Sequence, residues 1–178
     1  HNVWNATMAL AACCACGVSP KAAADALCRF AGVTRRMTEL GSVSGATVVD
    51  DYGHHPTEIR TTLQALRQRY SPRRLTCVFQ PHQGSRTRLL MDEFATSFTL
   101  ADETIVPDIY YVRDSELDRR SVTGADLAAR IRASGQSARY LPDFDQIVDY
   151  LRATAQRGDL IVTMGAGDIW EIARRLVA

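Results

Sequence analysis

The chain has 178 residues, of which 46% are hydrophobic and 23% are charged, and its formal net charge is +1. This composition is typical of a globular protein and gives no electrostatic reason to expect nucleic acid or an anionic membrane as a partner. No apolar run reaches the roughly 18–20 residues of a membrane-spanning helix, and the first residues lack the pattern of a signal peptide. We therefore expect a cytoplasmic protein.

The first thirty residues predict two helices and no strand. Residues 2–15 are rich in alanine and are soon followed by a glycine, which favours a helix with a glycine at its C-terminus. Ser19 and Pro20 have the residue types expected at the N-cap and first position of a second helix. We interpret residues 1–29 as the last helices of a preceding domain and residues 30–178 as a complete domain.

Two details predict that the chain is part of a longer protein. His1 already lies within the helical pattern. The only lysine, Lys21, follows a proline, so the G-K-[ST] phosphate-binding loop of many ATPases is missing.

From residue 37 onward, strand-like and helix-like segments alternate. The predicted strands are 37–40, 46–50, 75–79, 103–106, 139–141 and 160–164, with a glycine-bounded turn at 41–45. The predicted helices are 56–70, 86–100, 123–134, 143–156 and 168–177. This alternation is typical of βαβ units, so we expect an α/β, Rossmann-like fold with a mainly parallel sheet and helices on both faces.

The five cysteines favour neither a zinc site nor a disulfide framework, because their number is odd and four of them are clustered in a helical stretch rich in small residues. We interpret them as small buried thiols in a reducing compartment. They are Cys13, Cys14, Cys16, Cys28 and Cys77.

The first candidate site is the segment DDYGHHP, residues 50–56, between a predicted strand and a predicted helix. Asp50, Asp51, His54 and His55 beside a helix N-terminus could bind a ribose, a metal-bound phosphate or a metal. The alternative is structural, with an aspartate tying the loop and both histidines merely exposed. We favour function, because ligands of open α/β sheets bind outside the carboxyl ends of the strands.

The second candidate is FQPHQGSRT, residues 79–87, again at the end of a predicted strand. His82 and Arg86 could clamp a carboxylate, since arginine gives two parallel charge-assisted hydrogen bonds. Equally, Ser85 could cap the next helix and leave Arg86 in solvent.

Two further motifs are weaker. Residues 165–168, GAGD, could bring a ligand to the last helix, but an ordinary strand-to-helix turn is the simpler interpretation. Asn2 and Asn5 could both contact one planar ligand edge, and Arg35 and Arg36 could bind phosphate, although capping and solvation explain them as well.

Together these motifs resemble the Mur ligase family. The resembling segments span nearly the whole chain and are HNVWNATMALAA, FAGVTRRMTELG, VVDDYGHHPTEI, FQPHQGSRTRLL and VTMGAGDI. DDYGHHPTEI followed by FQPH-x-x-SRT resembles the branch that joins L-alanine to UDP-N-acetylmuramate. A relative that recycles a tripeptide shares the DD-x-x-HHPT segment and is the alternative within the family.

The resemblance implies an ATP-dependent amide synthesis for peptidoglycan precursors. ATP would phosphorylate the muramoyl carboxylate, and the amine of alanine would displace phosphate from the acyl phosphate. Such catalysis relies mostly on positioning and on neutralisation of charge. Family members have three domains, and this chain would be the end of the central ATPase domain followed by the whole third domain.

The resemblance also implies roles for individual residues. Its ATP-binding residues would be Asn2, Asn5, Arg36, Asp51 and His54. Its amino-acid-binding residues would be Tyr52, His82 and Arg86. Gln83 stands where the family commonly has arginine and Asp168 where it has asparagine, so the resemblance assigns neither of them a role.

Magnesium is implied for the complete enzyme, but its protein ligands would lie in the part that precedes this chain. We therefore predict no metal ligand here and no catalysis by the chain alone. Two other classes of function stay open. One is a metal-dependent hydrolase that uses Asp50, Asp51, His54, His55 and His82, and the other is a nucleotide-binding module without catalysis.

Overall fold

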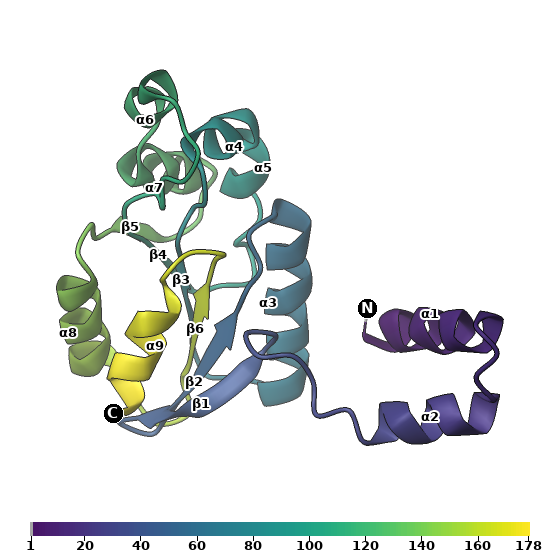
Figure 1. The fold of residues 1–178 in the computed structure, drawn as a ribbon. Helices are drawn as coiled ribbons and strands as arrows, with labels where there is room; N and C mark the ends of the chain where they lie inside the picture. Colours follow the sequence, from purple (N-terminus) through teal and green to yellow (C-terminus); the bar gives the residue numbers. More distant parts are fainter. Residues whose placement is uncertain (1) are drawn as a thin grey trace. The chain divides into compact units, whose positions relative to one another are not determined.

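The computed structural model describes residues 2–178, so His1 lies outside the described residues, as does the side chain of Asn2. The chain divides into two compact units, and the boundary in the sequence lies between Thr34 and Arg35. We call them the helical unit and the α/β unit and describe each by itself (Figure 1).

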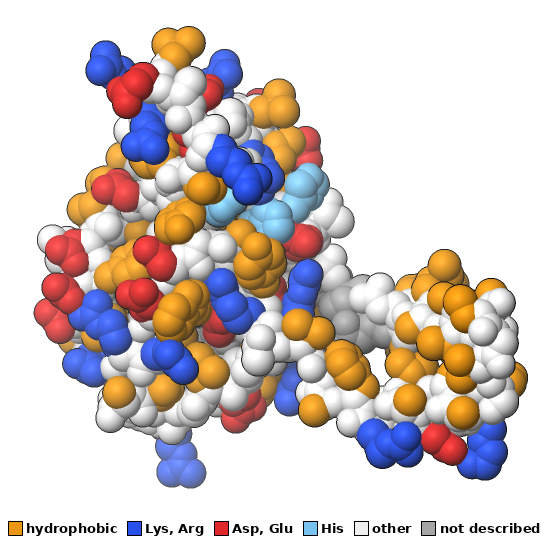
Figure 2. Space-filling view, in the orientation of Figure 1, with side chains coloured by type: hydrophobic (Ala, Val, Ile, Leu, Met, Phe, Trp, Pro, Cys, Tyr) orange, Lys and Arg blue, Asp and Glu red, His pale blue; other side chains and the backbone are white. Residues whose placement is uncertain are grey.

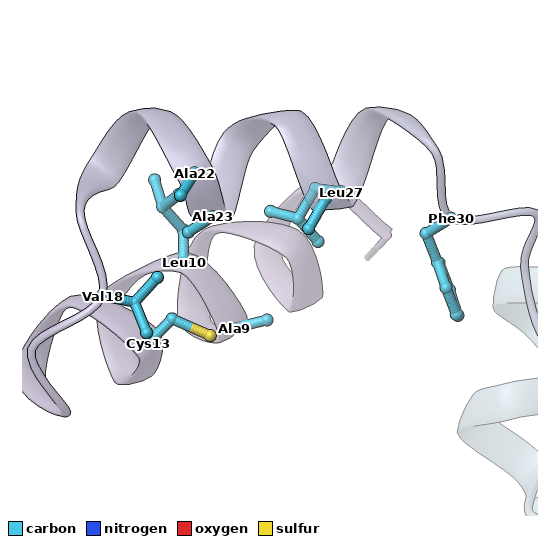
Figure 3. Close-up of a pocket in the computed structure, with 9 residues that line it drawn as sticks. Ala9, Leu10, Cys13, Val18, Ala22, Ala23, Leu27 and Phe30 are labelled. Carbon is cyan, nitrogen blue, oxygen red and sulfur yellow. The ribbon is translucent and has the colours of Figure 1, made fainter.

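The helical unit consists of α1 (Asn2–Ala15) and α2 (Pro20–Cys28). The hydroxyl of Ser19 accepts a hydrogen bond from the amide of Ala22 at 3.3 Å, which confirms the predicted N-cap of α2. Small and aliphatic side chains from both helices, together with Phe30, line a cavity of ≈ 280 Å³ (Figure 3). The helices contact each other without enclosing a core.

Most apolar side chains of the helical unit are exposed in the described structure. Val3, Trp4 and Met8 keep 79%, 75% and 67% of their surface, whereas Ala23 is buried. All five cysteines are free thiols, but Cys77 of the α/β unit is the one that is buried. The prediction of buried thiols is therefore wrong for Cys13, Cys16 and Cys28, which are exposed, because two helices provide too little surface to cover them.

The α/β unit is built on a six-stranded sheet in the order β1-β2-β6-β3-β4-β5. The strands are β1 (Thr38–Val43), β2 (Ala46–Asp51), β3 (Leu75–Phe79), β4 (Glu103–Val106), β5 (Ala138–Tyr140) and β6 (Leu160–Met164). β1 pairs with β2 antiparallel, and every other pair is parallel. The predicted α/β, mainly parallel fold is confirmed.

Helices cover both faces of this sheet, as Figure 1 shows. The helices are α3 (Pro56–Tyr70), α4 (Gly84–Leu89), α5 (Met91–Ala95), α6 (Glu116–Ser121), α7 (Gly124–Ala133), α8 (Phe144–Thr154) and α9 (Trp170–Val177). One core cluster joins β-strand residues to α3, α5 and α7, and the other joins them to α8 and α9. The central strands β3 and β6 are buried along their whole length, as parallel strands covered on both faces must be.

Two predicted elements differ from the structure by more than two residues at an end. β1 continues through Gly41, where the register shifts, so the turn lies at Ser44 and Gly45 instead of residues 41–45. The single helix predicted over 86–100 is two short helices separated at Leu90, whose φ of −104° and ψ of 18° leave the helical region. Packing of the residues after this break against Phe79 decides it, since propensity alone favours continuation.

Helix α6 was not predicted. It buries no side chain, so it shows no hydrophobic periodicity. A capping box between Ser115 and Asp118 begins it, and this Ser-x-x-Asp pattern is the signal that could have found it. None of the helices in residues 2–178 has the length and hydropathy of a membrane crossing.

Candidate functional site

Three loops that carry predicted site residues meet at one end of the sheet. β2, β6 and β3 are parallel neighbours, so their carboxyl ends lie side by side. The loop after β2 carries Tyr52 and His54, the loop after β3 carries His82, and the turn after β6 begins at Gly165. β6 lies between β2 and β3, so the strand order reverses here, and such a reversal is where doubly wound sheets bind ligands.

The carboxylate of Asp51 is buried and holds the loop after β2. Its Oδ1 accepts hydrogen bonds from the amide of Gly53 at 2.8 Å and the hydroxyl of Thr62 at 3.4 Å. Its Oδ2 accepts one from the amide of Met37 at 2.9 Å. Both oxygens thus have partners inside the α/β unit, which favours the structural interpretation of Asp51 over a direct contact with a nucleotide ribose.

Asp50 is buried beside Asp51 and pairs with two other elements. Its Oδ1 accepts the hydroxyl of Thr163 at 2.7 Å, and its Oδ2 accepts Nε of Arg35 at 3.0 Å. Burial raises the pKa of the Asp50 carboxyl above its ordinary value, against the lowering effects of Thr163 and Arg35. Thr163 and Arg35 thus stabilise the ionised form of Asp50 against the effect of burial.

The loop after β2 ends in the N-terminus of α3. The ring of His55 accepts the amide of Thr57 at 3.3 Å, and Glu58 accepts the amides of His54 and His55, which completes a capping box. These two amides and the nearby His54 ring lower the pKa of Glu58, outweighing the opposing effect of burial. His55 is thus a cap, whereas the ring of His54 lies beside the Tyr52 ring, with its Nδ1 3.2 Å from the Tyr52 carbonyl.

Four aromatic side chains form a continuous row across the site, and we call Tyr52, His54, His82 and Tyr110 the aromatic row. Ring centroids are 5.4 Å apart for Tyr52 and His54, 6.2 Å for His54 and His82, and 5.7 Å for His82 and Tyr110, which stack nearly parallel. Backbone hydrogen bonds fix the last pair, because the amide of Tyr110 donates to Pro81 and the amide of Gln83 donates to Tyr110. The row joins the loops after β2, β3 and β4.

His82 and Arg86 each keep a buried polar atom without a partner among the described residues. These atoms are Nδ1 of His82 and Nη1 of Arg86. Burial lowers the pKa of His82, and the positive charge of Arg86 lowers it further, which favours the neutral form of the ring. A buried guanidinium nitrogen without an acceptor is costly unless an anionic group completes it. The pair therefore has the chemistry of a carboxylate-binding site.

The turn after β6 packs tightly against the loop after β3. The side-chain amide of Gln80 donates to Oδ1 of Asp168 at 2.8 Å and accepts the amide of Ile169 at 3.2 Å. A Cβ on Gly167 would lie 2.7 Å from Cγ of Tyr110 and 2.5 Å from Oε1 of Gln80. GAGD is thus a close-packed turn, and its Asp168 helps to hold the loop after β3.

The structure brings together six of the eight predicted binding residues in the α/β unit: Arg36, Asp51, Tyr52, His54, His82 and Arg86. Arg36 is exposed, with its guanidinium carbon 6.0 Å from the centroid of the Tyr52 ring. Asn5 is exposed on α1 of the helical unit, and the side chain of Asn2 lies outside the described residues. The asparagine predictions stay predictions.

The sequence analysis assigned no role in the site to Gln80 or Tyr110. For Arg35 it left two alternatives, phosphate binding or exposure to solvent. Gln80 and Tyr110 both follow the carboxyl ends of strands, and this position is the signal that could have found them. No sequence pattern indicates that Arg35 binds Asp50, because fifteen positions and a strand separate them. On the α/β unit, Figure 2 shows histidine side chains gathered beside those of lysine or arginine.

Within residues 2–178, no cluster of three or more histidine, cysteine, aspartate or glutamate side chains could hold a metal ion. Asp50 pairs with Arg35, and Asp51 accepts hydrogen bonds from backbone amides. His55 caps α3. The geometry therefore does not support a metal-dependent hydrolase built on the DDYGHH loop.

Fold and site define a doubly wound α/β domain whose candidate site, at the carboxyl ends of its strands, suits an anionic group. The chain belongs to the Mur ligase family: the model of the family described as "Mur ligase, glutamate ligase domain" matches residues 35–167. It is 41% identical over 177 residues to the UDP-N-acetylmuramate–L-alanine ligase of Desulfitobacterium hafniense and 46% identical over 172 residues to that of Acetivibrio thermocellus. These matches cover 99% and 97% of the chain but only 39% and 36% of the relatives.

Solved structures give the same result. The UDP-N-acetylmuramate-alanine ligase of Thermotoga maritima matches with a TM-score of 0.78 and 28% identity, covering 99% of this chain and 37% of that one. A murein peptide ligase of Psychrobacter arcticus matches with a TM-score of 0.76 and 34% identity, covering 99% and 36%. The chain is thus similar both to an alanine ligase and to a murein peptide ligase.

Proposed function

We propose that this chain is the C-terminal portion of an ATP-dependent ligase that joins L-alanine to UDP-N-acetylmuramate in peptidoglycan precursor synthesis. The curated relatives named above, which span more than twice its length, support this assignment. In this proposal, residues 1–29 belong to the central ATPase domain, and residues 30–178 form the domain that holds the amino acid. The proposal includes a cytoplasmic location, because the reaction consumes ATP.

One observation carries the amino-acid site: Nη1 of Arg86 and Nδ1 of His82 are buried and unpaired at the carboxyl end of β3. The carboxylate of alanine would accept hydrogen bonds from Arg86, and the neutral ring of His82 would avoid adding a second positive charge beside it. Tyr52, at the other end of the aromatic row, would border the same space. The small volume and single negative charge of alanine suit such a clamp.

The reaction proceeds in two steps. The muramoyl carboxylate attacks the terminal phosphorus of ATP and gives an acyl phosphate and ADP. The amine of alanine then attacks the acyl carbon, phosphate leaves and the nitrogen loses a proton. A clamp on the alanine carboxylate contributes by holding the amine at one orientation and distance from the acyl carbon.

For the nucleotide, we propose contacts from Asn2, Asn5, Arg36 and His54, and an indirect role for Asp51. Arg36 is well suited because its charge is exposed beside Tyr52. Asp51 would act by shaping the loop after β2, given its internal hydrogen bonds. Magnesium would be held by residues outside this chain, and no step is assigned to it here.

The test is ADP release by the full-length ligase, with UDP-N-acetylmuramate and with or without L-alanine, for the wild type and the Arg86→Ala variant. Loss of a charge-assisted clamp should raise the KM for alanine by on the order of 100-fold. Arg88→Ala is the matched control, since Arg88 lies on the same helix and is exposed. Its KM should stay within about twofold of the wild type, as expected for an exposed, weakly paired side chain.

Each outcome has a meaning. Release that needs both substrates, together with the KM increase in Arg86→Ala alone, supports the proposal. Release that ignores alanine but responds to a tripeptide would favour a recycling ligase, which the likeness to the murein peptide ligase keeps as the second candidate. ATP binding without release would favour a non-catalytic nucleotide-binding module. The 178-residue chain alone should release no ADP, because it has no G-K-[ST] loop.

A further inference from the structure

Arg35 binds three separate acceptors in the site. Its Nε donates to Oδ2 of Asp50 at 3.0 Å, its Nη2 to the carbonyl of Gly165 at 2.6 Å, and its Nη1 to the carbonyl of Gly167 at 3.1 Å. The side chain is 23% exposed, whereas that of Asp50 is 3% exposed. Each acceptor is bound by a different nitrogen of the guanidinium, whereas lysine has one nitrogen at the end of its side chain, so lysine cannot reproduce the three contacts.

The other contacts of Arg35 lead to Tyr52. Its guanidinium carbon lies 5.2 Å from the centroid of the Tyr52 ring, and its carbonyl accepts the amide of Tyr52 at 2.8 Å. The backbone of Arg35 has a φ of 59°, a conformation that non-glycine residues adopt at an energetic cost. The hydrogen bonds of the Arg35 side chain and carbonyl stabilise this backbone conformation.

Arg35 thereby closes the aromatic row into a ring of contacts. At one end of the row, Tyr52 lies against the guanidinium. At the other end, Tyr110 packs so closely against Gly167 that a Cβ there would lie 2.7 Å from its ring, and the carbonyl of Gly167 is held by Arg35. The members of the ring are Arg35, Tyr52, His54, His82, Tyr110 and Gly167.

This closure couples the two ends of the row. If Arg35 releases the carbonyls of Gly165 and Gly167, the turn after β6 is free to shift, and Tyr110 must move with Gly167 because they are in contact. Tyr52 loses its cationic neighbour in the same event. His82 stacks on Tyr110, so its position depends on both.

We propose that Arg35 is a positioning residue of the amino-acid site, which sets the placement of His82 through Tyr110 on one side and through Tyr52 on the other. Its kinetic consequence rests on the proposed function, whereas its structural consequence rests on the contacts alone. Arg35 binds no substrate in this proposal.

The kinetic test compares Arg35→Gln and Arg35→Lys with Arg73→Gln in the full-length ligase. Arg73 is the matched control, because it also pairs with a buried aspartate, Asp159, but at the opposite end of the sheet. Both Arg35 variants should raise the KM for alanine by about tenfold, since a displaced binding group weakens a positioned substrate. Arg73→Gln should lower thermal stability and leave the KM unchanged.

A second measurement does not depend on catalysis. In the 178-residue chain, the NMR signals of the His82 ring carbons and protons report the stacked Tyr110 ring through its ring current. These signals should shift in Arg35→Gln and Arg35→Lys and should stay in place in Arg73→Gln.

The outcomes separate this inference from the proposed function. Unchanged His82 signals in both Arg35 variants would overturn it, as would an unchanged alanine KM at reduced stability, because Arg35 would then be merely structural. The inference would also be overturned if Arg35→Lys kept the wild-type KM for alanine and the wild-type His82 signals. A positive charge at this position would then be enough to hold His82 in place. Shifted His82 signals in a ligase that ignores alanine would support the positioning role and reject the proposed acceptor. If Arg35→Gln does not fold, Arg35→Lys decides.

Discussion

The two ends of the parallel sheet in the α/β unit place their charged side chains in different ways. At the amino ends, the carboxylates are paired with arginines: Glu103 accepts Arg74 at 2.6 Å, and Asp159 accepts two nitrogens of Arg73 at 3.0 and 3.3 Å. At the carboxyl ends, His82 and Arg86 keep buried atoms without partners. The arginine pairs serve stability at the amino ends, although Oε1 of Gln136, just before β5, also lacks a partner among the described residues. The unpaired nitrogens of His82 and Arg86 differ in lying on the loop and helix that carry the candidate site.

The contrast is not confined to hydrogen bonds. The amino-end carboxylates directly precede or begin strands β4 and β6, so their pairs fix where these strands start. The carboxyl-end residues lie in loops that join neighbouring strands, and aromatic rings connect them. A change at one end should therefore affect the free energy of unfolding and a change at the other end should affect binding.

The largest effect should come from Glu103→Ala at the amino ends. Glu103 is buried and accepts hydrogen bonds from Arg74, Arg139 and Tyr150. Its removal leaves these donors without their acceptor and should lower the free energy of unfolding by about 3 kcal/mol, measured by urea denaturation. The KM for alanine in the full-length ligase should not change. A raised KM with unaltered stability would reverse the roles of the two ends.

A smaller effect on stability, but a large one on binding, should follow from Gly167→Ala. The new Cβ would clash with Tyr110 and Gln80, and relief of the clash should cost about 2 kcal/mol. Because Tyr110 must move, the KM for alanine should rise more than about tenfold. Gly135→Ala is the control: it has a φ of 87° with open space around it, so it should lose about 1 kcal/mol without a change in KM.

The smallest effect should be a pH dependence from His82. Its pKa in the folded state is lowered below the ordinary 6.5, so the unfolded chain binds more protons near and below that pH. The free energy of unfolding should therefore fall as the pH drops below 6.5, and His82→Asn should flatten this slope. The measurement is urea denaturation of the wild type and the variant at several pH values from 5 to 8. If the free energy of unfolding depended more steeply on pH in the variant, His82 would be charged in the folded protein.

The predictability of individual elements follows their local signals. The strand LTCVF and the helix that begins at Pro56 have the predicted bounds, because a short apolar run and a helix with a proline start and one apolar face are local patterns. The predicted helix over 86–100 failed at Leu90, where packing against Phe79 overrides propensity. α6 buries nothing and gave no periodic signal.

The site was predictable only as a set of motifs. His54 and His82 were identified because they follow strands, yet Asp51 and His55 were singled out by the same reasoning and are occupied by backbone amides. A residue type and its position at a strand end do not reveal whether its polar atoms are already satisfied. That depends on contacts such as Met37 with Asp51, which the sequence does not encode locally.

By itself, the sequence determined the alternation of strands and helices, the class of fold and the motifs shared with the Mur ligases, because hydrophobic periodicity, capping residues and short segments are local properties. Only the tertiary structure decided which polar atoms remain free, that Tyr110 extends the aromatic row, and that Arg35 joins its two ends. β6 enters the sheet between β2 and β3 from the far end of the chain, and with it comes the turn whose carbonyls Arg35 binds. Contacts between segments so far apart depend on the complete fold, since no local pattern specifies them.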